Sequence, residues 1–193
     1  MRKIVVTENI SLDGVMQAPA MPDEDLRDGF PHGGWANRYF DQVMADYMTA
    51  DADQEGCLLL GRRTYEGMAA NWPHMPADNP FTQWINAMPK FVASGTLTGP
   101  LDWNATLLDG DLGEAVRELK AGEGPDLTVL GSGVLVRSLR EHGLIDEYLL
   151  SIHPLLLGTG VRLFPDGAAA DLELVDSVTT TTGVLIARLR RVG

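Results

Sequence analysis

The sequence predicts an α/β fold built on a mixed, mainly parallel β-sheet. Short apolar runs alternate with segments of helical periodicity through the first two thirds of the chain, as in parallel strands that helices cover on both faces. The last third is rich in strand-like segments, which indicates antiparallel strands added at one edge. Because 193 residues with 45% hydrophobic content can bury a large core, we expect a single domain over residues 1–193.

Each expected element follows from its local pattern. Apolar runs of strand length occupy residues 3–11, 56–60, 90–94, 105–108, 127–130 and 145–153. Apolar residues spaced three or four positions apart predict helices over residues 35–50, 62–70, 81–87, 111–121 and 134–142. Asp111 with Glu114 three residues later is a helix-start signature. Strand-like segments at 161–165, 172–178 and 184–191 predict a terminal antiparallel ladder.

A long loop lies between the first expected strand and the first expected helix. Residues 17–34 contain prolines at positions 19, 22 and 31 and glycines at 29, 33 and 34. Loops of this length in compact domains are usually functional or mobile. Two interpretations are open: a lid over a ligand cleft, and a disordered insertion.

Composition excludes several classes of partner. The net charge of −12 argues against nucleic acid and anionic membranes, because both require a basic face. Cys57 is the one cysteine, and the four histidines are far apart in sequence, so we expect no metal site. No apolar run approaches the ~20 residues that span a bilayer, and the first strand turns polar too early for a signal peptide. We therefore expect a cytoplasmic protein.

The segment from Cys57 to Glu66 carries the first functional signal. A buried strand ends at Gly61, and Arg62-Arg63-Thr64 opens a helix. The first N–H groups of a helix are unpaired and its dipole is positive at that end, so this point can seat an anion. Two guanidinium groups are unusual there unless a phosphate lies between them. The alternative is a plain strand-turn-helix connection with solvated arginines.

Two more strand ends are polar or rich in glycine, namely Ser94-Gly95-Thr96 and Gly131–Leu135. Ligands of open α/β sheets bind beyond the carboxyl ends of the strands. Gly61–Thr64 and Gly131–Leu135 each feed a helix start, so together they can hold a diphosphate between two helix dipoles. The standard G-x-G-x-x-G fingerprint is absent, because Val136 stands three residues beyond Gly133.

These motifs, in this order, resemble the dihydrofolate reductase superfamily, and within it the branch related to the C-terminal reductase domain of the bifunctional riboflavin-biosynthesis deaminase-reductase. The matching segments are Ser11–Gly14, Leu60–Glu66, Lys90–Ser94, Val129–Gly133 and Ile145–Tyr148 leading to His153-Pro154. They extend from about residue 2 to residue 165. The resemblance implies a dihydrofolate-reductase-like three-layer αβα sandwich on a mixed, mainly parallel sheet that binds NADPH.

The resemblance also implies roles for individual residues. It places the cofactor against Asn9, Met16, Gly61, Arg62, Arg63, Thr64, Ser94, Gly131, Ser132, Gly133, Val134 and Leu135. Arg62 with Thr64 would meet the cofactor phosphates, and Arg62 or Arg63 would pair with the 2′-phosphate, a dianion that suits a guanidinium. Ser94 would lie near the adenosine and residues 131–134 around the diphosphate. Met16 would approach the nicotinamide, and the backbone of Asn9 its carboxamide.

The implied reaction is hydride transfer between NADPH and a pyrimidine- or pteridine-like small molecule. The substrate would be handled as by a 5-amino-6-(5-phosphoribosylamino)uracil reductase or a dihydrofolate reductase, in the CH–OH or CH–NH donor class. Dihydrofolate reductases supply the proton from a carboxylate early in the helix after the lid loop. Asp41 and Asp46 are the candidates here, although Ala45 falls nearest to that position. Asp13 is a further candidate; a solvated helix face for Asp41 and a turn for Asp13 are the alternatives.

Three ring-bearing side chains are candidates for contact with the substrate. Trp35 and Trp72 can stack a flat heterocycle, or they can belong to the core. His153 can line the pocket, or it can be a satisfied, partly buried histidine. The missing carboxylate keeps a second function open, a nucleotide-binding relic without catalysis. We also expect a homodimer, with the strand-rich tail as its interface.

Overall fold

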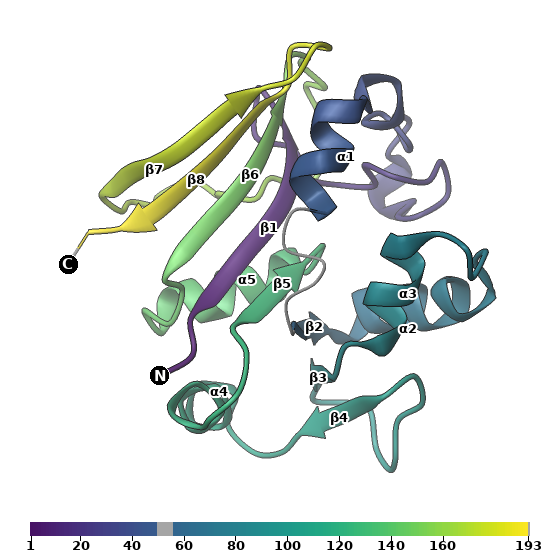
Figure 1. Cartoon of the computed structure of the whole chain (residues 1–193). Coiled ribbons are helices and arrows are strands. Elements are labelled where there is room, and N and C mark those ends of the chain that lie inside the picture. Colours follow the sequence, from purple (N-terminus) through teal and green to yellow (C-terminus); the bar gives the residue numbers. More distant parts are fainter. Residues whose placement is uncertain (50–55, 193) are drawn as a thin grey trace. The chain divides into compact units, whose positions relative to one another are not determined.

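The computed structural model describes residues 1–49 and 56–192 and divides them into two compact units. Unit 1 comprises Met1–Val5 and Met48–Ile145, and unit 2 comprises Val6–Tyr47 and Asp146–Gly193. Strand β1 (Ile4–Ser11) contributes to both, in the hydrogen-bonded strand order β4-β3-β2-β5-β1-β6-β8-β7 (Figure 1). The expectation of a single domain stays a prediction.

Unit 1 is the alternating part of the chain. Its further strands are β2 (Cys57–Gly61), β3 (Lys90–Ala93), β4 (Ala105–Leu108) and β5 (Leu127–Leu130). The pairs β2–β3, β2–β5 and β3–β4 are all parallel. The helices are α2 (Arg62–Asn71), α3 (Pro80–Ala87), α4 (Leu112–Ala121) and α5 (Gly133–Glu141), with a 3₁₀ turn η3 (Trp72–His74) after α2. The predicted alternation of strands and helices is confirmed.

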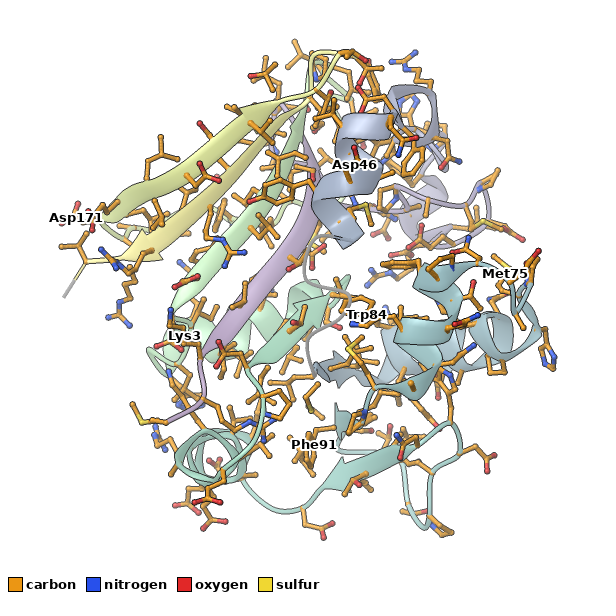
Figure 2. The ribbon with its side chains drawn as sticks, in the orientation of Figure 1. Lys3, Asp46, Met75, Trp84, Phe91 and Asp171 are labelled. Atoms are coloured by element: carbon orange, nitrogen blue, oxygen red, sulfur yellow. The ribbon has the colours of Figure 1, made fainter. Side chains whose placement is uncertain are left out.

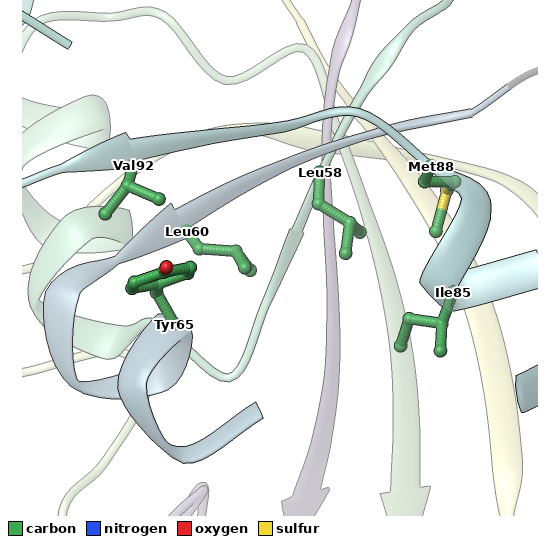
Figure 3. Close-up of a cluster of buried hydrophobic side chains, with 6 residues drawn as sticks. All are labelled: Leu58, Leu60, Tyr65, Ile85, Met88 and Val92. Atoms are coloured by element: carbon green, nitrogen blue, oxygen red, sulfur yellow. The ribbon is translucent and has the colours of Figure 1, made fainter. Parts of the chain in front are cut away.

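Strand β2 runs through the core of unit 1. Leu58 and Leu60 pack with residues of α2, α3 and β3 in the cluster of Figure 3: Leu58, Leu60, Tyr65, Ile85, Met88 and Val92. Cys57 and Leu59 are equally buried, and strand side chains alternate between faces, so β2 is covered on both sides. Burial of one such leucine contributes about 2–3 kcal/mol relative to exposure.

Local capping explains where two of these helices begin. The Asp111 carboxylate accepts a hydrogen bond from the Glu114 N–H at 3.0 Å, which confirms the predicted start of α4. The Asn79 side chain accepts from the Phe81 N–H at 2.9 Å, and Pro80 occupies the first position of α3, where its missing N–H costs nothing.

Unit 2 holds the antiparallel part of the sheet. Its strands are β6 (Glu147–His153), β7 (Leu172–Thr179) and β8 (Leu185–Arg191), in addition to most of β1. β8 pairs with β6 and with β7, both antiparallel, so the mixed sheet and its antiparallel edge are confirmed.

The prediction of a strand at residues 161–165 is wrong. Within the described part of the chain, this segment makes only an isolated bridge between Val15 and Arg162. Its backbone groups bond to a loop instead: the Val161 carbonyl accepts from the Met16 N–H at 2.9 Å, and the Leu163 N–H donates to the Gly14 carbonyl at 3.0 Å. Because these bonds go to residues of a turn, the segment does not pair with a neighbouring strand over a continuous stretch.

The helix predicted over residues 35–50 is shorter than expected. A 3₁₀ turn η2 (Asn37–Tyr39) precedes α1 (Gln42–Thr49), and Phe40 between them is extended, with φ −68° and ψ 129°. Asp41 then caps α1, since its carboxylate accepts from the Met44 N–H at 2.9 Å. The apolar spacing continues across this break, so periodicity alone missed it.

The loop at residues 17–34 has a defined path, unlike the predicted disordered alternative. It contains the 3₁₀ turn η1 (Arg27–Gly29). The buried Gln17 side chain donates to the carbonyls of Asp25 (3.2 Å) and Arg27 (3.1 Å) and accepts from the Val161 N–H (2.9 Å). A role as a lid stays a prediction. Among the described residues, no helix is both long enough and apolar enough to cross a bilayer.

Candidate functional site

The carboxyl ends of three parallel strands meet at one edge of unit 1. β2 and β3 are in register with Gly61 opposite Ala93, and β5 runs parallel to β2 on its other side. The polar segments that follow these strands therefore lie at the same edge, as the sequence predicted. We call Gly61–Thr64, Ser94 and Gly131–Leu135 together the strand-end site.

Hydrogen bonds join the ends of β2 and β5 directly. The Ser132 hydroxyl oxygen accepts from the Gly61 N–H at 3.0 Å and lies 3.0 Å from the Thr64 hydroxyl. The Ser132 hydroxyl also lies 2.9 Å from the Leu130 carbonyl, and the Thr64 hydroxyl donates to the Gly131 carbonyl at 3.0 Å. Both hydroxyl groups are thus engaged within the protein.

Two helices begin at this site. No side chain in the described part of the chain caps α2 or α5, and the first bond of α5 is from the Val136 N–H to the Ser132 carbonyl (2.9 Å). The N–H groups before that bond, with the dipoles of both helices, favour an anion. Gly131 leads into α5 at φ +58°, a conformation that glycine adopts without strain.

The two arginines of the site differ in their surroundings. Arg62 makes an ion pair with Glu66 one turn further along α2, at 3.0 Å. Both partners are solvent-exposed, and such pairs contribute about 0.3–0.5 kcal/mol, so an anion can displace Glu66 easily. Arg63 is exposed and has no ion pair among the residues that the structure describes. An anion therefore need displace no ion pair of the described residues to contact Arg63.

Ser94 organises the turn after β3. Its hydroxyl oxygen accepts from the N–H groups of Thr96 (3.1 Å) and Leu97 (2.9 Å). This turn lies beside the start of α2, since Ala93 pairs with Gly61. Contact of Ser94 with adenosine stays a prediction.

The other predicted cofactor positions, Asn9 and Met16, belong to unit 2. Asn9 Oδ1 lies 2.9 Å from His153 Nε2, and the rings of Trp35 and Tyr39 meet the imidazole edge to face at 5.1 and 5.4 Å. His153 is only 1% exposed, and its Nδ1 has no hydrogen-bond partner among the described residues. Burial lowers the pKa of His153 to about 4, so the ring is neutral at physiological pH.

The candidate aromatic and apolar contacts are largely core. Met16 is buried, and the Trp35 indole N–H donates to the Gln17 carbonyl at 2.8 Å while its ring packs with Val15, Ala18 and Phe30. In unit 1, the Trp72 ring meets Phe81 at 5.4 Å against the apolar cluster. These contacts favour the core interpretation of both tryptophans; their stacking on a substrate stays a prediction.

The Asp13 carboxylate is committed to a turn. It accepts from the Ser11 hydroxyl (2.6 Å), the Leu157 N–H (3.1 Å) and the Gly158 N–H (2.7 Å). Partial desolvation acts to raise its pKa, but these hydrogen bonds prevail and lower it to about 2. A carboxyl group with so low a pKa is ionised at neutral pH, so it carries almost no proton to donate as a general acid.

Asp41 is similarly engaged. Besides capping α1, its carboxylate accepts from the Thr181 hydroxyl (2.6 Å) and from the N–H groups of Thr181 (2.7 Å) and Thr182 (3.3 Å). These bonds, the Thr181 hydroxyl foremost, lower its pKa. Asp46 lies one turn further along α1, where it accepts from the Gln42 side chain at 2.7 Å (Figure 2). Proton donation by any of these carboxylates stays a prediction.

Unit 2 contains a cavity that the sequence did not predict. Its volume is about 210 Å³, and it is lined by Gln17, Arg27, Asp28, Phe30, Thr159, Gly160 and Val161. Arg27 is held in an ion pair with Asp25. Gly160 has φ +116°, and a Cβ there would come within 2.7 Å of Phe30. The length of the 17–34 loop was the one sequence signal for this cavity, because the contact of that loop with residues 159–161 depends on the tertiary fold.

These features define an α/β protein in which two helix starts without side-chain caps lie at one edge of the sheet. The chain belongs to the RibD C-terminal domain family, which it matches over residues 2–186. It is 29% identical over 169 residues to YyaP of Bacillus subtilis strain 168, covering 82% of this chain and 86% of YyaP. It is 28% identical over 163 residues to YwjB of the same strain, covering 84% of this chain and 83% of YwjB.

Solved structures share the fold. A protein of Shewanella sp. PV-4 attributed to riboflavin biosynthesis aligns over 99% of both chains, with a TM-score of 0.68 and 21% identity. A pyrimidine reductase-like protein of Corynebacterium diphtheriae aligns over 100% of this chain and 92% of its own, with a TM-score of 0.66 and 13% identity. At these identities the likeness establishes the fold, which confirms the expected fold class.

Proposed function

We propose that the protein is an NADPH-dependent oxidoreductase that transfers a hydride between the cofactor and a pyrimidine-like small molecule. The observation that carries this proposal is the strand-end site, where Ser132 joins two helix starts that have no side-chain cap and Arg63 lies in the first turn of α2. Membership of the RibD C-terminal domain family supports it independently.

The residues of the strand-end site fit the phosphates of NADPH. The backbone N–H groups at the start of α5 suit the diphosphate, and Gly131 supplies the φ of +58° that leads the chain into this helix. Arg63 suits the 2′-phosphate, because a guanidinium and a phosphate dianion form charge-assisted hydrogen bonds. When bound, the cofactor supplies the hydride, and the protein orients it and excludes water.

A pyrimidine is favoured over a pteridine as the substrate. The family is that of the RibD C-terminal domain, and a structural relative is described as pyrimidine reductase-like. Ala45 falls nearest to the position of the carboxylate that the resemblance to dihydrofolate reductases calls for, while Asp41 caps a helix. A substrate like 5-amino-6-(5-phosphoribosylamino)uracil is therefore the better candidate.

A titration tests cofactor choice. We expect the protein to bind NADPH at least tenfold more tightly than NADH, measured by quenching of tryptophan fluorescence. Arg63→Ala should weaken NADPH binding by about 1–3 kcal/mol and leave NADH binding nearly unchanged, because only NADPH carries the 2′-phosphate. Arg117→Ala, an exposed arginine on α4, is the matched control. Equal affinity for the two cofactors, or no binding at high micromolar NADPH, would overturn the assignment.

The rival function is a nucleotide-binding relic without catalysis. The observation that favours it is that Asp13 and Asp41 are both committed to structural hydrogen bonds. NADPH consumption followed at 340 nm separates the two functions across pyrimidines, pterins and quinones. Oxidation of NADPH with a ribosylated aminopyrimidine supports the reductase, whereas tight binding without consumption across the panel supports the relic.

A further inference from the structure

We propose that Ser132 and Thr64 are positioning residues: their hydroxyl groups lock the two helix starts of the strand-end site together and do not themselves bind the ligand's phosphate. The proposal rests on the proposed function, since it concerns the same anion site. It differs from the direct phosphate contact that the family resemblance implies for Thr64.

The position of Ser132 allows its hydroxyl group to join the starts of α2 and α5. Ser132 is the residue immediately before α5, and Gly61, whose N–H it binds at 3.0 Å, is the residue immediately before α2. One hydroxyl group therefore connects the N-terminal caps of both helices. Ser132 is 4% exposed, so its hydroxyl faces protein and not solvent.

The hydroxyl protons are already in use. Ser132 and Thr64 have one hydroxyl proton each, and three acceptor atoms lie within 3.0 Å of them: the Thr64 hydroxyl oxygen and the carbonyls of Leu130 and Gly131. A phosphate is an acceptor and would need one of these protons. Donation to the phosphate would therefore break one of these hydrogen bonds within the protein, which costs free energy.

The ligand's donors are then backbone groups. The Gly61 N–H is consumed by Ser132, so contact with an anion starts at the next N–H groups of α2 and at those of residues 133–135 in α5. These N–H groups can contact the same anion only if the two helix starts keep a fixed separation. The hydroxyl groups of Ser132 and Thr64 hold that separation, which raises the affinity for the anion because less conformational entropy is lost on binding.

Three single variants and the double variant Ser132→Ala/Thr64→Val test this positioning role. Ser132→Ala and Thr64→Val each remove a hydroxyl group with little change of side-chain shape. Thr64→Ser keeps the hydroxyl group at position 64 and removes only the methyl group. The matched controls are Ser138→Ala, whose hydroxyl bonds only to the Val134 carbonyl within α5, and Thr106→Val on the exposed side of β4. The ligands are NADPH and inorganic pyrophosphate. Amide hydrogen exchange at Gly61, measured by NMR without ligand, reports the lock itself.

We expect either single variant to weaken both ligands roughly tenfold, an effect of the size expected for one or two lost hydrogen bonds. The double variant should be no weaker than the worse single variant, because the two groups act as one unit. Exchange at Gly61 should accelerate in both variants, and Thr64→Ser should restore affinity and exchange. The two controls should leave all three measurements unchanged.

Other results overturn the proposal. If losses add in the double variant while exchange at Gly61 is unchanged, the hydroxyl groups bind the phosphate directly. If neither variant affects affinity, the lock has no role in binding. If the unaltered protein binds pyrophosphate but not NADPH, the proposed function is wrong, and the pyrophosphate affinities of the variants decide this inference. If it binds neither ligand, both the proposed function and this inference are wrong. If Ser132→Ala does not fold, Thr64→Val decides.

Discussion

At the scale of single residues, burial sets the chemistry of His153. Its imidazole has one hydrogen-bonded nitrogen, one nitrogen without a partner among the described residues, and T-shaped contacts with two aromatic rings. Burial away from water disfavours the charged imidazolium, so the folded protein holds the neutral ring. The consequence is a dependence of stability on pH.

We predict that the free energy of unfolding falls as pH drops from about 6.5 to 4. In this window the unfolded chain binds a proton at His153 and the folded chain does not, because the folded pKa is about 4 against an ordinary 6.5. The loss approaches about 3 kcal/mol at the low end. Urea unfolding between pH 7 and 4.5 measures it.

His153→Gln should flatten this profile, because glutamine keeps a polar partner for Asn9 but does not titrate. His142→Gln, at the exposed end of α5, is the control and should retain the slope. An unchanged slope in His153→Gln would show that other groups cause the acid destabilisation.

At the scale of elements, a buried lysine connects α3 to β3. Lys90 is 1% exposed at the start of β3, and its ammonium donates to the Met88 carbonyl (2.6 Å) and the Asn86 carbonyl (3.3 Å) at the end of α3. It also lies 4.1 Å from the centre of the Trp103 ring. Desolvation lowers the pKa of Lys90 to about 8. The ammonium thus acts as the C-terminal cap of α3.

Lys90→Ala should lower the free energy of unfolding by about 2–4 kcal/mol, because it leaves a cavity and two carbonyls of α3 without their donor. Lys90→Met keeps most of the packing and should lose less. Chemical denaturation of the three proteins gives both differences. If Met and Ala are equally destabilising, the ammonium contributes the whole effect and the aliphatic stem contributes none.

At the scale of the whole molecule, β7 is the last strand in the hydrogen-bonded order and presents an open edge. Two of its apolar side chains are exposed, Leu174 at 57% and Val175 at 48%. An open edge with apolar residues is a template for pairing with another chain. We propose that β7 forms the interface of a homodimer.

Light scattering after size-exclusion chromatography should give twice the chain mass of 20.9 kDa. Leu174→Lys should shift the protein to a monomer, because a charge on the interface strand opposes pairing. Leu156→Lys, at an exposed loop position, should not. A monomer of the unaltered protein at tens of micromolar would refute the homodimer.

Local sequence signals determined much about this protein. The strands of unit 1 follow from short apolar runs, and Asp111 marked the start of α4, because these features depend on residues a few positions apart. The three polar strand ends could be placed at one edge from the alternation of strands and helices alone. Family resemblance then supplied the expectation of NADPH.

Only the tertiary structure decided how the polar groups are used. Ser132 and Thr64 are 68 positions apart, and Gln17 and Asp13 bond to residues 144 positions away, so no local pattern predicts these bonds. The same holds for Asp41, whose carboxylate reaches Thr181 and Thr182. A side chain's hydrogen-bond partners are set by which distant segment the fold brings against it, and that is why the sequence indicated an anion site but not which of its groups are free to bind.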